Sequence, residues 1–333
     1  MFFNTINTIK TKNLPGGGAN WVIIGNSANI VKSIDGDNWS AATSNGGLTN
    51  PSGGGGVAYG KDGAGAGLWV AVSTGGSIIA NSKDGDIWTK ADSSGGLTTA
   101  NSVGYGQNGA GAGLWVAVGA GGIIAKSSDG NIWTPAGSKG GISTAYRVAY
   151  GKDGTGAGLW IAVGDGTPIV KSTDGNTWTA VGNNGGFGSG RDVTYGKDNL
   201  GVGLWVAVGG GTSLIAKSYD GNIWTPAGNN GSITFGTAVG YGKDGLGAGL
   251  WWAGGQTAIR STSTDGNIWT YVTNPTGIGA YPSGITYGTA AGLWVAVGTG
   301  AIIAKSTNGT TWTPATTKGG ITSGLYVAYK SIV

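Results

Sequence analysis

The chain has 333 residues, of which 73 are glycine, 15 are tryptophan and only 10% are charged. It contains no histidine, cysteine or glutamate, which excludes disulfides, Cys/His metal sites and Ser-His-Asp or Cys-His catalysis, so neither a metal nor a cofactor is expected. Lysine and arginine total 19 against 15 acidic residues, and this small excess forms no basic cluster of the kind that binds nucleic acid.

The N-terminal segment does not resemble a targeting signal. Residues 1–10 lack the basic segment and the long apolar run of a signal peptide. No apolar run in the chain approaches the roughly 18 residues of a membrane span, so membrane insertion is not expected. The sequence therefore predicts a cytoplasmic or virion-associated protein. Residues 1–20 precede the first repeat and are predicted to form an N-terminal extension.

A unit of about 45 residues repeats along the rest of the chain, and each unit holds four short runs that favour β-strands. In one copy the first run ends at Tyr150, the second covers 158–164, the third covers 168–172 and the fourth contains Trp178. Four strands in a unit of this length are typical of a propeller blade. Two tryptophan series mark the period, at Trp21, Trp69, Trp115, Trp160, Trp205, Trp251 and Trp294 and at Trp39, Trp88, Trp133, Trp178, Trp224, Trp269 and Trp312.

The two ends of the chain are predicted to share one blade. The first unit begins with its second run at Trp21, and the chain ends on an unmatched first run at 325–329. Seven copies of every run result only when residues 324–333 complete the first blade, which also removes the open sheet edges of an unclosed array. The sequence therefore predicts one all-β domain over 1–333. We expect a seven-bladed β-propeller with four antiparallel strands per blade, closed by the C-terminal strand.

The segment between the third and fourth runs carries a family resemblance. It reads Ser-Ile-Asp-Gly-Asp-Asn-Trp at 33–39 and recurs with small changes at 82–88, 127–133, 172–178, 218–224, 263–269 and 306–312. It resembles the Asp-box, or BNR, repeat of sialidases and of many non-catalytic, lectin-like propellers. The family places one residue between aspartate and glycine, whereas Asp35 and Gly36 are adjacent, and the seventh copy has Asn308 for aspartate. Similar repeats occur in predicted proteins of large viruses and phages.

These segments are interpreted as structural. Aspartate followed by glycine favours a tight turn, because glycine accepts positive φ and the carboxylate can bond amides further along the chain. The tryptophan that follows is expected to fill the space between neighbouring blades. We therefore expect turn formation, rather than catalysis or calcium binding, from Asp35, Asp84, Asp129, Asp174, Asp220 and Asp265.

The sialidase resemblance implies three arginines around a substrate carboxylate, a tyrosine nucleophile paired with glutamate, and an aspartate acid/base. The chain has three arginines, Arg147, Arg191 and Arg260, but no glutamate to activate a tyrosine. Arg260 also lies in a third run, where other copies have alanine. A glycosidase needs two carboxyls on either side of a bond, and only Asp165 and Asp192 stand outside the repeated turns near the expected binding face. Enzymatic activity is therefore not expected.

Candidate binding residues lie where the copies differ. The loops before each first strand and after each second strand share one face of a propeller, opposite the aspartate-glycine turns. On that face arginine, aspartate and tyrosine replace glycine and serine, and the candidate ligand-binding residues are Arg147, Asp165, Arg191, Asp192 and Tyr326. Such side chains among glycine loops suit a sugar or a peptide. The alternative is neutral drift of surface loops without any ligand.

The sequence thus predicts a non-catalytic recognition module whose partner is a glycan or a protein, with a glycan as the leading ligand. The alternative is a structural or scaffold component of a virus particle or another assembly, and a glycosidase-type enzyme is the third hypothesis. The oligomeric state is left open.

Overall fold

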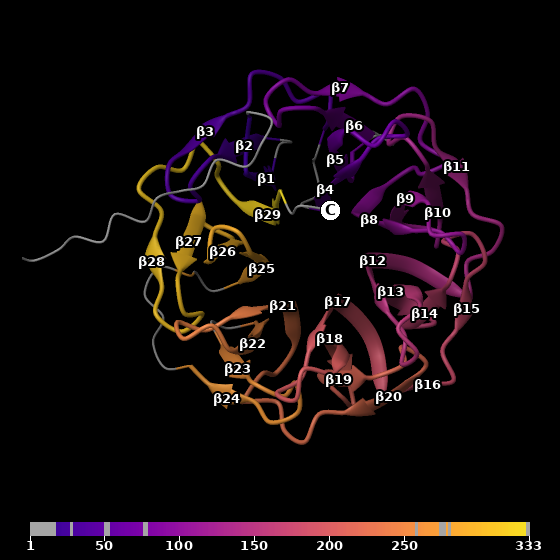
Figure 1. Ribbon diagram of the computed structural model, residues 1–333, viewed down its shortest axis with the longest axis vertical. Coiled ribbons are helices and arrows are strands. Elements are labelled where there is room, and N and C mark those ends of the chain that lie inside the picture. The colour runs from indigo at the N-terminus through magenta and orange to yellow at the C-terminus, as the bar shows by residue number, and fades with distance from the viewer. Residues whose placement is uncertain are drawn as a thin grey trace, which may run out of the picture.

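The computed structural model describes residues 18–26, 29–49, 54–75, 79–256, 259–272, 278 and 281–330. Seven four-stranded antiparallel sheets stand as blades around a central axis, which confirms the predicted all-β, seven-bladed propeller (Figure 1). The described part of the chain contains no α-helix, and so none that is long and apolar enough to cross a membrane. Most of the predicted extension, residues 1–17, and the last three residues, 331–333, lie outside the described residues.

Each blade has the same strand order from the axis to the rim. The innermost strands are β29 (Gly324–Tyr329), β4 (Gly55–Lys61), β8 (Ala100–Gln107), β12 (Ile142–Lys152), β17 (Phe187–Lys197), β21 (Gly236–Lys243) and β25 (Pro282–Gly288). The second strands are β1 (Trp21–Gly25), β5 (Gly67–Ser73), β9 (Gly113–Gly119), β13 (Gly158–Gly166), β18 (Gly203–Gly211), β22 (Gly249–Gly255) and β26 (Leu293–Gly298).

The third strands are β2 (Ile30–Ser33), β6 (Ile79–Ser82), β10 (Ile124–Ser127), β14 (Ile169–Ser172), β19 (Ile215–Ser218), β23 (Arg260–Ser263) and β27 (Ile302–Ser306). The outermost strands are β3 (Trp39–Ala41), β7 (Thr89–Lys90), β11 (Thr134–Pro135), β15 (Thr179–Ala180), β20 (Ile223–Pro226), β24 (Thr270–Tyr271) and β28 (Thr313–Pro314). A short extra strand, β16 (Asn183–Asn184), pairs in parallel with β20 at the rim of the fifth blade.

The C-terminal strand closes the ring as predicted. β29 pairs antiparallel with β1 and aligns Tyr329 with Trp21, whose ring centroids lie 4.5 Å apart. The equivalent tyrosine and tryptophan of the fourth blade, Tyr150 and Trp160, lie 4.9 Å apart. The first blade therefore reproduces the aromatic packing of an uninterrupted blade from two distant segments.

The apolar core lies between the blades. In β5, Trp69 and Ala71 pack with Val22 against the first blade, whereas Leu68 and Val70 pack against the third. The same division recurs at all seven blade interfaces. Both faces of each second strand are therefore buried, and this explains why these strands are continuous apolar runs.

The aspartate-glycine segments form the predicted turns between the third and outermost strands. In the third blade, the Asp129 carboxylate accepts hydrogen bonds from the backbone N–H groups of Asn131 and Ile132 at 2.8 and 2.9 Å. Gly130 has a φ of +75°, and its carbonyl accepts a bond from the indole of Trp133 at 3.2 Å. Trp133 is buried, so its predicted packing role is confirmed. The aspartate and the tryptophan of one copy thus both bond the backbone of the same turn.

In several copies a pair of hydrogen bonds, here called the polar clamp, joins the turn to a neighbouring blade. The Ser138 hydroxyl accepts a bond from the Trp178 amide at 2.8 Å and donates one to the Trp178 carbonyl at 2.9 Å. Thr317 and Trp39 make the same pair of bonds at 2.7 and 2.8 Å across the closure of the ring. The clamp is therefore a repeated contact between blades.

Candidate functional site

Six of the innermost strands, all but β4, carry a β-bulge near their first residues. β12 pairs Ala145 with Gly164 and then Arg147 with Val163, which leaves Tyr146 without a partner on β13. A bulge bends a strand and re-aims a side chain. Successive residues of a regular strand point to opposite faces, yet Tyr146 and Arg147 both line the axial cavity. The same register shift leaves Asn101, Arg191, Thr237, Ser283 and Leu325 unpaired.

The bulges create two layers of residues around the axis. The pocket ring consists of the six bulged residues and the glycine at the same position of β4, and its members are Gly55, Asn101, Tyr146, Arg191, Thr237, Ser283 and Leu325. The floor ring consists of the next residue of each strand, and its members are Gly56, Ser102, Arg147, Asp192, Ala238, Gly284 and Tyr326. Every blade thus contributes one residue to each layer.

The pocket ring surrounds a cavity of about 260 Å³. Its residues lie on the innermost strands, which surround the centre of the ring in Figure 1. All seven members line the cavity, together with Arg147 of the floor ring and with Gly54, Phe235, Tyr281 and Pro282 from adjoining positions. The cavity opens on the face where the innermost strands begin, opposite the aspartate-glycine turns. The lining combines aromatic rings, neutral hydrogen-bonding groups and two guanidinium groups, and no acidic residue is among these described residues.

Arg147 crosses the axis beneath the pocket ring. Its Nη2 lies 3.5 Å from the carbonyl oxygen of Ser283 in the seventh blade, and its Cζ lies 4.2 Å from the ring centroid of Tyr326 in the first. Its Nε lies 3.3 Å from the Asp192 carboxylate of the fifth blade. A side chain from one side of the ring is therefore held by three blades, and these residues form the floor of the pocket.

Close packing in the floor ring also explains one of its glycines. A Cβ on Gly284 would lie 3.0 Å from the Cα of Tyr326, with the tyrosine ring at 3.1 Å. The side chain of Tyr326 therefore occupies the space that a larger residue in the seventh blade would need. Burial raises the pKa of this tyrosine to about 12, so it is neutral at ordinary pH.

Asp192 supports the floor from a buried position. Its side chain is 3% exposed, and its two oxygens accept hydrogen bonds from the backbone N–H groups of Val193 and Val239, both at 2.9 Å. Burial raises the pKa of this carboxyl, and the charge of Arg147 and the two amides oppose that shift. Both oxygens of the Asp192 carboxylate are therefore bonded below the pocket lining, and their contacts position Arg147.

Arg191 is held at the pocket wall by aromatic rings. Its Cζ lies 4.2 Å from the ring centroid of Tyr146 and 5.4 Å from that of Phe235, distances at which a cation is attracted to an aromatic face. The Tyr146 hydroxyl donates to Asp165 at 2.6 Å, and the Ser189 hydroxyl donates to the other oxygen of Asp165 at 2.5 Å. Asp165 therefore positions Tyr146, which in turn supports Arg191.

The environment of Asp165 favours its charged form. Burial alone would raise the pKa of this carboxyl, but the hydrogen bonds from Ser189 and Tyr146 and the charge of Arg191 lower it below its ordinary value. Burial, and after it the same hydrogen bond, raise the pKa of Tyr146. A charged Asp165 accepting from a neutral Tyr146 is thus the stable state at neutral pH.

The structure brings the five predicted site residues into two connected clusters. Arg147 contacts both Asp192 and Tyr326 in the floor, and Asp165 reaches Arg191 through Tyr146. Of the five predicted residues, only Arg147 and Arg191 line the cavity. Direct ligand contact by Asp165, Asp192 and Tyr326 stays a prediction, and their observed contacts are to other side chains.

The prediction did not include several lining residues, namely Asn101, Phe235, Thr237, Pro282, Ser283 and Leu325. The signal of Asn101, Thr237, Ser283 and Leu325 was their alignment one position before the floor ring, but small, neutral and apolar residues did not stand out there. Phe235 and Pro282 lie further from the floor ring in the sequence and had no such signal.

Arg260 lies in the third strand of its blade as expected, buried in β23 and bonded to the Ile278 carbonyl. Its expected alignment with the alanines of other copies is wrong, because the strand register gives Arg260 the position of Ile124 and Ile215, and Ser261 takes the position of the alanines.

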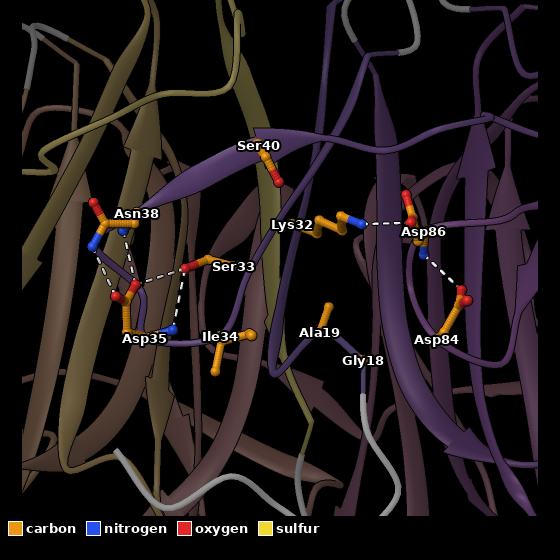
Figure 2. A pocket seen from close by; sticks show the side chains of 10 residues that line it. All are labelled: Gly18, Ala19, Lys32, Ser33, Ile34, Asp35, Asn38, Ser40, Asp84 and Asp86. Carbon is orange, nitrogen blue, oxygen red and sulfur yellow. Dashed lines mark hydrogen bonds and ion pairs between the residues drawn. The ribbon is translucent and has the colours of Figure 1, made fainter. Parts of the chain in front are cut away.

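A larger hollow of about 510 Å³ lies between the first two blades on the side of the turns. In Figure 2 most of its charged and polar side chains bond one another: Asp35 bonds Ser33 and Asn38, and Lys32 forms an ion pair with Asp86. The Lys32 Nζ lies 2.6 Å from the Asp86 carboxylate. These residues belong to the repeated turn and to the blade interface. We therefore take the smaller axial pocket as the candidate site.

No protein-family model and no curated protein matches the sequence. Solved propellers match the fold. YCF48 bound to D1 peptide has a TM-score of 0.58 at 17% identity, covering 84% of this chain and 88% of that one. A protein from Lactobacillus plantarum has a TM-score of 0.59 at 11% identity, covering 93% and 98%. A GH74 xyloglucanase from Xanthomonas campestris has a TM-score of 0.50 at 16% identity, covering 79% of this chain and 45% of that one. These likenesses extend to the fold, which hosts both enzymes and non-enzymes.

Proposed function

We propose that this protein is a non-catalytic recognition module that binds a glycan in the axial pocket. The observation that carries the proposal is the pocket ring, in which seven blades each contribute one residue and all seven residue types differ. Ligand sites typically combine apolar walls with a few placed polar groups. Here Tyr281 and Phe235 supply aromatic surface, and Asn101, Thr237 and Ser283 supply hydrogen-bonding groups.

The size of the pocket supports a small recognition unit. A cavity of about 260 Å³ is slightly smaller than the sites that enclose drug-sized ligands, so it suits one sugar residue at the end or branch of a chain. Tyr281 is 45% exposed at the edge of this cavity, where its ring is open to the next residue of a bound saccharide. Aromatic rings at the edge of a pocket can stack against sugar rings, and polar groups inside it can bond sugar hydroxyls.

The carboxylates near the pocket support a non-catalytic role. Hydrolysis of a glycoside requires one carboxyl to give a proton and a second to act as base or nucleophile. Asp165 is charged and bonded to Tyr146 and Ser189, and Asp192 is bonded to Arg147 and two backbone amides. Neither lines the cavity, so the pair is poorly placed to act on a bound sugar.

A peptide is the second candidate ligand. One structural neighbour, YCF48, is bound to a peptide, and it shares the ring architecture over most of both chains. The pocket volume also fits one amino-acid side chain or a chain end. The two ligand classes are separated by presenting both to the same protein.

The test is binding of the labelled protein to an array that carries neutral and acidic oligosaccharides and to a peptide array. Ser283→Trp fills the pocket and should abolish glycan binding, whereas Thr155→Trp on the exposed turn of the opposite face should leave it intact. Melting curves of both variants check that the fold is retained. Glycan binding that survives Ser283→Trp would place the site elsewhere, and binding to peptides alone would replace the glycan with the second candidate.

A further inference from the structure

The face that carries the aspartate-glycine turns, here called the turn face, has two irregularities side by side. One is an exposed leucine at the tip of a loop in the sixth blade, and the other is a hollow between the seventh and first blades. We propose that the turn face is an interface between two copies of this chain, in which the leucine tip of each copy enters the hollow of the other. The proposed glycan site lies on the opposite face, so the dimer does not depend on it.

The hollow accompanies a short loop in the seventh blade. The inner loop of a blade is defined here as the loop that joins its innermost strand to its second strand. Trp251 follows Tyr241 by ten residues across the inner loop of the sixth blade, whereas Trp294 follows Tyr287 by seven. A hollow of about 590 Å³ lies beside the shorter loop, and its lining includes Ala291 of that loop and residues from the turns of the seventh and first blades. The turn of the first blade is therefore left partly uncovered.

A missing hydrogen bond shows what a longer inner loop supplies at this place. The indole N–H of Trp294 donates to the Lys243 carbonyl of the sixth inner loop at 2.7 Å, and the third to sixth blades repeat this bond with the loop of the preceding blade. Trp21 is the equivalent residue of the first blade, and its indole N–H is buried without an acceptor among the described residues. The short seventh loop therefore leaves this blade interface incomplete.

The inner loop of the sixth blade presents an apolar tip. Leu246 at this tip is 96% exposed, and the second and third blades have alanine at the equivalent position. The Asp244 carboxylate accepts hydrogen bonds from the N–H groups of Leu246 and Ala248 at 2.8 and 2.9 Å, which fixes the shape of the loop. Leu200, at the tip of the fifth inner loop, is 82% exposed and extends the apolar surface to the next blade. Apolar residues exposed together in this way are typical of an interface.

The tip and the hollow lie at neighbouring places on the ring, because the sixth and seventh blades are adjacent (Figure 1). A Cβ on Gly245 of the sixth inner loop would lie 3.3 Å from the Cβ of Asn308, a residue that lines the hollow. The repeat places all inner loops at a similar distance from the axis of the ring. A two-fold axis between the tip and the hollow would therefore make both contacts at once when two turn faces meet, and two-fold symmetry is the commonest symmetry of homodimers.

The hollow suits an apolar tip in its surface and its size. Ala291 and Leu293 line it and pack against the core between the seventh and first blades. A volume of about 590 Å³ has room for Leu246 and the loop residues beside it. The chain exposes 13069 Å², and a stable dimer covers about 800 Å² of each partner. A contact over part of the turn face is therefore large enough for a dimer.

The charges around the tip and the hollow are complementary. Two carboxylates, Asp35 and Asp37, line the hollow with one lysine, Lys305, which forms an ion pair with Asp37. Lys243 at the base of the tip is exposed and makes no ion pair within the described part of the chain. The Asp244 carboxylate beside it bonds two N–H groups of its own loop. Lys243 of one copy is therefore free to approach Asp35 of the other.

The experiment measures the mass of the full chain by sedimentation velocity over a range of concentrations, and we expect a concentration-dependent dimer. Leu246→Asp should weaken it about a hundredfold, or roughly tenfold for each of the two tips. Thr313→Trp, which fills the hollow, should weaken it similarly. Ala110→Asp at the equivalent tip of the third blade and Thr179→Trp at the equivalent position of the fourth blade are the matched controls, and both should leave the dimer unchanged. Melting curves of all four variants check the fold.

A second measurement uses the absence of cysteine from the chain. Leu246→Cys and Thr311→Cys variants, mixed under mild oxidation, should form a disulfide-linked pair of chains, because the tip of one copy meets the hollow of the other. Ala110→Cys mixed with Thr311→Cys is the control and should stay unlinked.

A protein that stays monomeric at every concentration would overturn the inference and leave the hollow to another occupant, such as residues 1–17 or a different protein. A dimer that persists in Leu246→Asp or in Thr313→Trp would also overturn it, because the contact would then lie elsewhere on the molecule. Neither result bears on the axial pocket, which the array experiment with Ser283→Trp tests separately.

Discussion

The aspartate-glycine turns and the pocket ring lie on the same seven blades, but they differ in how much their residues vary from blade to blade. The turns repeat one solution with little change, and even Asn308 accepts bonds from Thr310 and Thr311 at 3.0 and 2.8 Å, as the aspartates do from their own turns. The pocket ring has a different residue type in every blade. A turn contacts its own blade and its neighbours, so one arrangement serves seven times. Residues near the axis face one another across the ring, so seven equal bulky or charged side chains would collide or repel.

This comparison bears on why some positions differ between the blades. Drift of surface loops would produce side chains without specific contacts. Instead, Arg147 is held by residues of three other blades, and Arg191 contacts rings from two. The residues that vary near the axis therefore form a packed floor, made by the floor ring, and an open pocket, lined by the pocket ring. This pocket is the candidate site.

The largest expected effect belongs to the repeated side of the comparison. Trp178→Ala should lower the free energy of unfolding by about 3–5 kcal/mol, because a fully buried indole leaves a cavity between two blades. Tyr281→Ala at the edge of the pocket is the contrasting variant and should cost about 0.5 kcal/mol or less, because this ring is half exposed. Both values come from urea unfolding followed by tryptophan fluorescence. Similar losses for the two variants would mean that the turns do not carry more stability than the pocket edge.

The floor ring should behave as a coupled structural unit. Asp192→Asn alone should cost about 3 kcal/mol, because it leaves the Arg147 charge buried and unpaired. Arg147→Met alone should lower the free energy of unfolding by a similar amount, because it leaves the Asp192 carboxylate buried without its cation. The double variant should cost clearly less than the sum of the two, as residues in direct contact do in a mutant cycle. Additive losses would show that the ion pair contributes no coupling to the floor.

The smallest effect concerns acid stability of the turns. Burial tends to raise the pKa of Asp129, but hydrogen bonds from the amides of Asn131 and Ile132 outweigh it and lower the pKa below its ordinary value of 3.8. The unfolded chain therefore takes up the proton first, and the stability that this carboxylate contributes above pH 3.8 is lost as the pH falls through the lowered value. Asp129→Asn should cost about 1 kcal/mol or less at pH 7 and should make stability less sensitive to acid.

Melting curves at neutral and acidic pH check this prediction. Asn308→Asp is the reciprocal variant in the seventh copy, and it should make the protein more sensitive to acid by introducing a titrating group into an equivalent turn. An unchanged pH dependence in both variants would show that the turn carboxylates do not contribute to acid unfolding.

The sequence by itself determined the repeat, the number of blades and the closure of the ring. These follow from local patterns: the period of the tryptophans, the apolar second strands and the orphan run at 325–329 each appear in the printed sequence. It also singled out Arg147 and Arg191, because charged residues are conspicuous where other copies have small ones. The repeat, the number of blades and the closure depend on contacts within one blade or between adjacent blades, and such contacts repeat with the chain.

Only the tertiary structure decided which of the irregular residues face the pocket. The bulges in β12 and β17 turn Tyr146 and Arg191 into the axial pocket beside Arg147, and no glycine or proline at those two positions announces the bulge. The pairing of Arg147 with Asp192, and its contact with Tyr326 from the other side of the ring, bring together residues that share one position of the repeat but are distant in the sequence. Closing the ring creates these contacts, because only at the axis do all seven blades meet.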